Sequence, residues 1–278
     1  TALWLLRRRP SSTRSFDPLA MNADPIATMP RSLHPFLIVL IALAAIPGGA
    51  GAQTDDTELH IPEPMIFDLV RGLGAKKGEL ETNVLAEFPI NRTASREIEW
   101  APEVEYAFAD GLAIEFELPF EDGELEGYKG AFQWTIGQPG GGRFIHGTQF
   151  IAVRSAHEES WELTGLYIPA FRFNSVWSVL GMVGLRDQVG PDRRDVSAIL
   201  LNGTVFAQLS EQTTLGLELN NTNPNDAIEE TENDFELLVM PQWHQEFTEH
   251  FSLQLGLGGQ FADERFDTTF ALRAILEF

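Results

Sequence analysis

The chain of 278 residues contains no cysteine. An exported protein without cysteine is not a disulfide-stapled scaffold, and it lacks the thiol that accepts the lipid of a lipoprotein. Basic residues are also scarce, because 19 Lys and Arg stand against 41 Asp and Glu, for a formal net charge of −22. Phosphate contacts require a basic surface, so the composition argues against nucleic acid as a partner.

Long apolar runs are almost absent as well. Residues 36–46 (FLIVLIALAAI) form one such run, which is too short for the roughly twenty residues of a spanning helix. Arg31 precedes the run and Ala50-Gly51-Ala52 follows it, which is the order of charge, apolar core and small residues in a secretory signal peptide. We therefore expect residues 1–52 to be an upstream extension and a signal peptide that is cleaved before Gln53.

After Gly78 the apolar residues recur with a period of two, the spacing of β-strands. The expected strands cover residues 80–88, 98–108, 112–120, 128–136, 144–153, 161–168, 176–185, 198–209, 213–221, 235–243, 251–261 and 266–278. An even number, about twelve, is what a single-chain bacterial barrel with both ends in the periplasm requires. The sequence predicts an all-β fold: an antiparallel transmembrane β-barrel over residues 78–278, preceded by a short periplasmic segment or plug over residues 53–77.

The last strand ends on an aromatic residue and has one apolar face, formed by Phe270, Leu272, Leu276 and Phe278. It resembles the C-terminal sorting signal of bacterial outer-membrane β-barrels. That resemblance implies the barrel-assembly machinery as a partner, and an outer membrane of the Gram-negative type, with its lipid and lipopolysaccharide, as the location. A soluble β-sandwich also ends on alternating strands, so the pattern alone does not separate the two folds. The leader and the alternation of long and short connections favour the barrel.

Prolines oppose a regular barrel, since proline removes a ladder donor and is normally confined to strand ends or bulges. Pro119 and Pro169 are expected at strand ends. Pro102 and Pro241 fall inside expected strands, so we expect a bulge or a broken ladder at each.

Acidic residues gather on the face opposite the apolar one over the first three strands. This expected lumen-facing acidic wall consists of Glu81, Glu97, Glu99, Glu103, Glu105, Glu115 and Glu117. Like charges across strands destabilise a sheet, and a buried carboxylate needs a partner. Either the lumen is hydrated and attracts cations, or basic groups neutralise the wall.

Five basic residues are the candidates for such neutralisation in the lumen: Lys129, Arg143, Arg154, Arg172 and Arg273. Arg273 is the most specific of them, because barrel closure would pair the last strand with the first and bring its guanidinium near Glu79 or Glu81. We favour structural neutralisation over a cation pathway, because charged ladders also fill small barrels that conduct nothing.

No catalytic or cofactor-binding pattern accompanies these charges. His146-Gly147-Thr148-Gln149 has no Ser nucleophile in a G-x-S-x-G setting, and His244 and His250 lack the ligand spacing of a zinc site. We expect no enzyme activity, no cofactor and no metal.

The stretch Ala101–Phe120 has Pro102, then Tyr106, a tight turn at Asp110-Gly111, and Glu117-Leu118-Pro119. It resembles the hairpin of the outer-membrane family linked to the meta-cleavage pathway of phenol degradation, although Ala107 stands where that family has Gly. The resemblance implies a transporter-like barrel for small, hydrophobic or aromatic compounds. It carries over no binding residues.

The expected function is thus a channel or transporter-like barrel through which a small molecule or a cation permeates. Two alternatives remain: a non-conducting structural or adhesive barrel that displays the acidic loop of residues 220–233, and a secreted soluble β-sandwich.

Overall fold

The computed structural model describes residues 59–67, 69–91, 98–139, 142–192, 197–223, 236–262 and 265–278. The expected signal peptide and most of the acidic loop of residues 220–233 lie outside these ranges. None of the described residues forms a helix long and apolar enough to cross a membrane.

The described strands are β1 (Leu80–Pro89), β2 (Glu99–Ala109), β3 (Leu112–Glu117), β4 (Phe120–Glu121), β5 (Glu124–Leu125), β6 (Gly127–Gly137), β7 (Phe144–Ser155), β8 (Trp161–Arg172), β9 (Trp177–Val189), β10 (Ser197–Gln208), β11 (Thr213–Asn223), β12 (Glu236–Thr248), β13 (Phe251–Ala262) and β14 (Arg265–Glu277).

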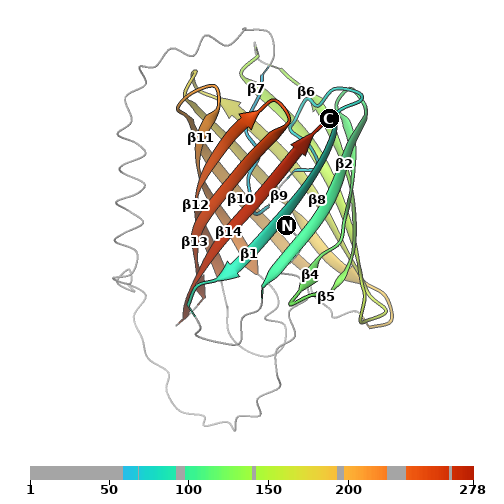
Figure 1. Cartoon of the computed structure of the whole chain (residues 1–278). Coiled ribbons are helices and arrows are strands. Elements are labelled where there is room, and N and C mark those ends of the chain that lie inside the picture. The colour runs from blue at the N-terminus through green and yellow to red at the C-terminus, as the bar shows by residue number, and fades with distance from the viewer. Residues whose placement is uncertain are drawn as a thin grey trace, which may run out of the picture. The chain divides into compact units, whose positions relative to one another are not determined.

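All of these strands belong to one antiparallel sheet that closes on itself (Figure 1). Each long strand pairs with its neighbour in the chain, and β1 pairs with both β2 and β14. β4 continues β3, and β5 leads into β6 across Glu126, so the fourteen segments described amount to a barrel of twelve strands. Closure leaves no sheet edge, which is the requirement for crossing lipid with strands.

The closed barrel confirms the expected fold class and strand number, and most strand positions agree within a few residues. The alternative of a β-sandwich is wrong, because a sandwich has two sheets and here the first and last strands are hydrogen-bonded neighbours. Their register runs from Glu81 opposite Glu277 to Pro89 opposite Thr269.

The turns follow from local backbone preferences. Asp110-Gly111 joins β2 to β3, and Gly111 has a positive φ of 71°. Asp122-Gly123 joins β4 to β5, and both residues have positive φ, as the tight hairpin turns that match strand twist require.

The two faces of the barrel wall differ in the expected way. On β3, Ile114 and Phe116 are 46% and 52% exposed, whereas the alternate residues Ala113, Glu115 and Glu117 are buried inside. The outer face is therefore apolar, which suits contact with hydrocarbon, and the inner face carries the charges.

Three prolines interrupt the ladders without shifting the register. Strand partners are missing at Pro102 between β2 and β3–β4, at Pro241 between β12 and β13, and at Pro169 between β8 and β9. The broken ladders at Pro102 and Pro241 confirm the expectation. For Pro169 the expected position was wrong, since it lies inside β8, where the missing N–H is tolerated at the gap.

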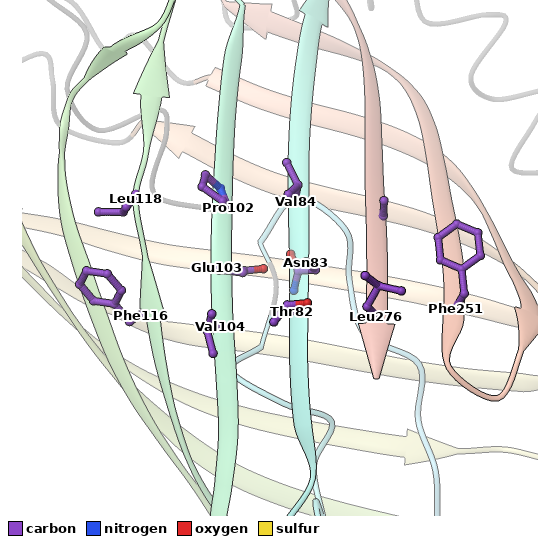
Figure 2. Close-up of a pocket in the computed structure, with 11 residues that line it drawn as sticks. Thr82, Asn83, Val84, Pro102, Glu103, Val104, Phe116, Leu118, Phe251 and Leu276 are labelled. Carbon is purple, nitrogen blue, oxygen red and sulfur yellow. The ribbon is translucent and has the colours of Figure 1, made fainter. Parts of the chain in front are cut away.

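The gap at Pro102 opens onto a groove of about 480 Å³ on the wall (Figure 2). Outward apolar side chains from strands on both sides of the β1–β14 closure line it, including Val84, Phe116, Phe251 and Leu276. Most of its lining belongs to the apolar outer face, and the inward-facing Asn83 and Glu103 also line it.

Packing between β8 and β9 is tightest at Gly184, where a Cβ would lie 2.0 Å from the carbonyl oxygen of Gly165. At Gly181, on the same strand, the nearest atom is 3.8 Å away. We expect Gly184→Ala to lower the free energy of unfolding by about 1–3 kcal/mol, because the β8 backbone must shift. Gly181→Ala is the control and should change it little. The measurement is the unfolding temperature of the folded band on semi-native gels, and equal temperatures for both variants would contradict the expectation.

Candidate functional site in the barrel lumen

The described residues between 59 and 77 pass through the interior of the barrel, and we call them the lumen plug. Leu59, Ile61, Leu69 and Leu73 of the plug are at most 6% exposed. They pack against an apolar wall contributed by β7 to β10, which consists of Ile145, Leu166, Ile168, Ala170, Leu180, Met182, Leu200 and Phe206. One side of the lumen is therefore closed by hydrophobic contact.

The plug also fits glycines of the barrel wall. A Cβ on Gly147 of β7 would lie 2.7 Å from Leu73 Cδ2, and a Cβ on Gly256 of β13 would lie 3.2 Å from Met65 Sδ. Wall atoms are as near or nearer, since the same Cβ atoms would lie 2.7 Å from Trp134 O and 2.8 Å from Met240 Sδ, so glycine at these positions leaves space for both the plug and the wall.

Glu218 on β11 binds the backbone of plug residues 65–67, which we call the plug tip. Its carboxylate accepts hydrogen bonds from the amides of Met65 (3.0 Å), Ile66 (3.1 Å) and Phe67 (2.8 Å). Asn220 and Gln242 donate to the same carboxylate. A fully buried carboxylate needs several donors, and here successive backbone N–H groups supply them.

The opposite side of the lumen is acidic. Glu81, Glu103, Glu105, Glu115 and Glu117 point inward from β1, β2 and β3 and are each at most 5% exposed. One carboxylate oxygen from each of Glu103, Glu105 and Glu115 lies within 4.8 Å of the others. Charges this close in a buried place repel strongly, so the barrel requires cations beside them.

Two of those cations come from barrel strands. Arg273 of β14 is fully buried, and its Nη2 lies 3.2 Å from Glu103, 3.3 Å from Glu105 and 3.6 Å from Glu81. Lys129 of β6 lies 2.7 Å from Glu115 and 2.5 Å from Glu117. Closure of β14 on β1 thus delivers the guanidinium to the acidic side.

The third cation, Arg71, belongs to the plug. Its guanidinium pairs with Glu81, lies 3.4 Å from Glu79 and 3.9 Å from Glu105. Burial alone would lower the pKa of Arg71, but the nearby carboxylates, led by Glu63 and Glu81, raise it above its ordinary value. Arg71 is therefore a permanent charge, and its carbonyl is held by Gln133 Nε2.

The remaining candidates from the sequence lie elsewhere. Glu99 is half-buried on the inner face of β2, and Glu97 lies outside the described residues. Arg154 donates to the carbonyls of Ser155 and Ser160 in the connection after β7, and Arg172 donates to the carbonyl of His60 in the plug.

Arg143 is exposed at the start of β7. Among the described residues, Arg143, Arg154 and Arg172 make no ion pair with the acidic wall, so charge neutralisation there falls to other groups. Arg154 and Arg172 instead donate to backbone carbonyls, Arg154 next to its own strand and Arg172 in the plug.

The residues of the expected sorting signal lie on the outer face of β14. Leu276 and Phe278 are 46% and 70% exposed, and Phe270 and Leu272 are half-buried. The amide of Phe278 donates to the carbonyl of Leu80 at 2.9 Å, which ties the end of the chain to β1. Their role in sorting stays a prediction.

Arg71 and Glu218 are functional candidates that sequence reasoning missed. A single Arg in a short amphipathic segment and one Glu on a strand of alternating residues carry no distinctive pattern. The one available signal was the surplus of acid over base on the expected inner face, which requires a cation from outside the strands.

A family model described as HAEPLYID-like matches residues 57–131, which is less than half of the chain. The matched range contains the plug and the buried carboxylates of β1 to β3, together with Lys129, but it ends before Glu218 and Arg273. The chain matches no curated protein.

Among solved structures, the KdgM porin in complex with disordered oligogalacturonate is similar at 10% identity and a TM-score of 0.55, over 71% of this chain and 99% of that one. An outer membrane channel from Pseudomonas putida F1 is similar at 14% identity and a TM-score of 0.56, over 74% and 98%. The NanC porin is similar at 7% identity and a TM-score of 0.56, over 70% and 98%. The fold is that of porin-like outer-membrane barrels. None of these comparisons tests the resemblance to the phenol-degradation family.

Arg273 offers a direct test of charge neutralisation. We expect Arg273→Met to lower the free energy of unfolding by about 3–5 kcal/mol, because it leaves buried carboxylates without their cation. The folded band on a semi-native gel should be lost at a lower temperature. Arg143→Met, at the exposed rim, is the matched control, and the same unfolding temperature for both variants would show that Arg273 is dispensable.

Glu218 tests the attachment of the plug. We expect Glu218→Gln to speed hydrogen exchange at the amides of residues 65–67 by at least about tenfold, because hydrogen bonds to a charged acceptor are lost. Glu211→Gln, in the exposed turn before β11, is the control and should leave these rates unchanged. Unchanged protection in Glu218→Gln would mean that other contacts hold the tip.

Proposed function

We propose that the protein is an outer-membrane channel for small molecules, gated by its own N-terminal segment. The observation that carries this proposal is a closed barrel with an apolar outer face whose interior holds a segment from outside the strands. The likeness of the fold to porins and an outer membrane channel supports the channel role and the outer membrane as its location.

The way in which the plug is attached supports gating. The plug adds no strand to the barrel. The backbone hydrogen bonds that join its described residues to the sheet gather at the C-terminal end of β2. There Gly111 donates to the carbonyl of Ala75, and Gly78 donates to that of Ala107. Elsewhere in the lumen the backbone of the plug is bound by side chains of the wall, such as Glu218, Gln133 and Gln149. Withdrawal of the plug would therefore break no strand ladder.

The permeant class follows from the two sides of the lumen. The acidic side attracts cations and repels anions. The apolar side suits a hydrocarbon or aromatic body, as the resemblance to the phenol-degradation family also implies. We propose small, hydrophobic or aromatic molecules and cations as permeants, with no catalytic step.

The remaining partners follow from this location. We propose contact with outer-membrane lipid and lipopolysaccharide through the apolar outer face, and insertion by the barrel-assembly machinery through Phe278 and the outer face of β14. The expected signal peptide would deliver the chain to the periplasm.

Single-channel recording in planar bilayers tests the proposal. We expect the full mature chain to give rare or small currents and Glu218→Gln to give larger or more frequent ones, because the plug tip is released. Selectivity for cations in a salt gradient should fall when Glu103 and Glu105 become Gln. Glu211→Gln should behave like the parent chain.

A barrel that is folded and inserted but silent in every variant would overturn the channel and favour a non-conducting structural barrel. The loop proposed for adhesion spans residues 220–233, of which 224–233 lie outside the described residues.

A further inference from the structure

The lumen plug presents a cation and apolar side chains in adjacent positions. Arg71 reaches the acidic side, while Leu69 and Leu73, two residues before and after it, pack on the apolar wall. The plug thus resembles a small molecule with a charged head and a hydrocarbon body, bound between two walls that fit each part.

The space around Arg71 has the properties of a cation site. Glu81, which is 2% exposed, and Glu105, which is fully buried, lie beside the guanidinium, with the partly exposed Glu79 at its edge. The amide of Asn83, 3% exposed, donates to both Glu81 and Glu105. Its Oδ1 has no hydrogen-bond partner among the described residues, and the same holds for Arg71 Nε. A ligand that is not tethered to the plug backbone can orient its N–H donors to satisfy this oxygen.

Charge makes an empty site unfavourable. Six inward carboxylates on β1 to β3 are almost fully buried, and Arg71, Lys129 and Arg273 are cations that pair within this group in the described part of the chain. When the plug leaves, Arg71 and Glu63 leave together, so Glu81 and Glu105 lose the guanidinium beside them and Arg273 loses the plug carboxylate 3.8 Å from its Nη1. Another cation or a proton must then take the place of Arg71 beside Glu81 and Glu105.

We propose that the lumen position held by Arg71 is the recognition site of the channel for organic cations, namely a primary ammonium or guanidinium group carried on an apolar body. The head group pairs with Glu81 and Glu105, and the body lies on the apolar wall that Leu69 and Leu73 vacate. The plug is then a tethered competitor for the permeant. This inference rests on the proposed function and deepens it.

Other solutes fit less well. An anion would be repelled by the carboxylates. A polyol would bury hydroxyl groups against the apolar wall, where they find no hydrogen-bond partners. An inorganic cation would satisfy the carboxylates but gain nothing from the wall. The joint requirement for positive charge and hydrocarbon is what distinguishes the proposed ligand class.

The test uses the full mature chain carrying Arg71→Ala, which removes the tethered guanidinium. Two probes of similar shape are compared in detergent micelles: n-butylguanidinium, which is charged, and n-butylurea, which is neutral. We expect n-butylguanidinium to bind at least about tenfold more tightly, measured by calorimetry, because only the charged probe pairs with the carboxylates. It should also raise the unfolding temperature of the variant on semi-native gels.

Three controls separate a specific site from a general effect. The parent chain, in which Arg71 fills the site, should respond to neither probe. Arg143→Ala, at the rim, should behave like the parent chain. Unsubstituted guanidinium should bind Arg71→Ala less tightly than n-butylguanidinium, because it leaves empty the space that the methylene groups of Arg71 occupied. If Arg71→Ala does not fold, Arg71→Gln keeps the hydrogen-bonding capacity without the charge, and the same ranking of probes is expected.

Equal binding of the two probes, binding of neither, or the same response in the parent chain would overturn the site. Conductance of Arg71→Ala separates this outcome from failure of the channel itself. If Arg71→Ala conducts but binds n-butylguanidinium no more tightly than n-butylurea, the channel is supported and the proposed site is wrong. If Arg71→Ala binds n-butylguanidinium selectively but never conducts, the proposed site is supported and the proposed channel is wrong.

Discussion

Ion pairing between the buried carboxylates and three cations is the constraint on which the rest of the interior depends. The carboxylates lie on neighbouring strands near the start of the barrel, whereas Arg273 comes from its last strand, Lys129 from β6 and Arg71 from a segment outside the sheet. A buried charge without a partner costs several kcal/mol, so the absence of any one of the three parts leaves buried carboxylates without a cation. Barrel closure, strand order and plug position are therefore coupled through one cluster of charges.

The plug also resolves a conflict within the lumen. A channel interior is usually polar, but β7 to β10 present an apolar cluster to it beside buried polar residues such as Gln149, Asn202 and Thr204. The plug covers this wall with Leu59, Ile61, Leu69 and Leu73 and places its one buried cation on the other side. A short amphipathic segment thus satisfies two chemically different surfaces at once, and the same two surfaces become available together when it leaves.

Much of the fold could be predicted from the sequence, because a period of two reports a strand with two different faces wherever it occurs. Pro102 and Pro241 likewise predict gaps in the hydrogen-bond ladder, because proline has no N–H to donate wherever it lies in a strand. The approach of Arg273 to Glu81 follows from closure, since the last strand of a barrel must pair with the first. These properties are local or are forced by topology.

The attachment of the plug could not be predicted in the same way. Glu218 meets the amides of residues 65–67 across about 150 positions of chain, a contact set by the path of the plug and not by any repeat. The roles of Arg154 and Arg172 could not be predicted either, because both side chains donate to backbone carbonyls, and no sequence pattern marks which carbonyl lies within reach of an arginine.

The most direct test of the central claim, that the plug closes the lumen and must move for passage, is a reversible cross-link between plug and wall. The chain has no cysteine, so Met65→Cys with Gly256→Cys gives a single thiol pair, at a position where a Cβ on residue 256 lies 3.2 Å from Met65 Sδ. Joined by a short reducible cross-linker, the barrel should be silent in a planar bilayer, and reduction should restore currents that each single-cysteine variant shows throughout. Currents of the same size and frequency before and after reduction would contradict the account, because passage would then not depend on movement of the plug.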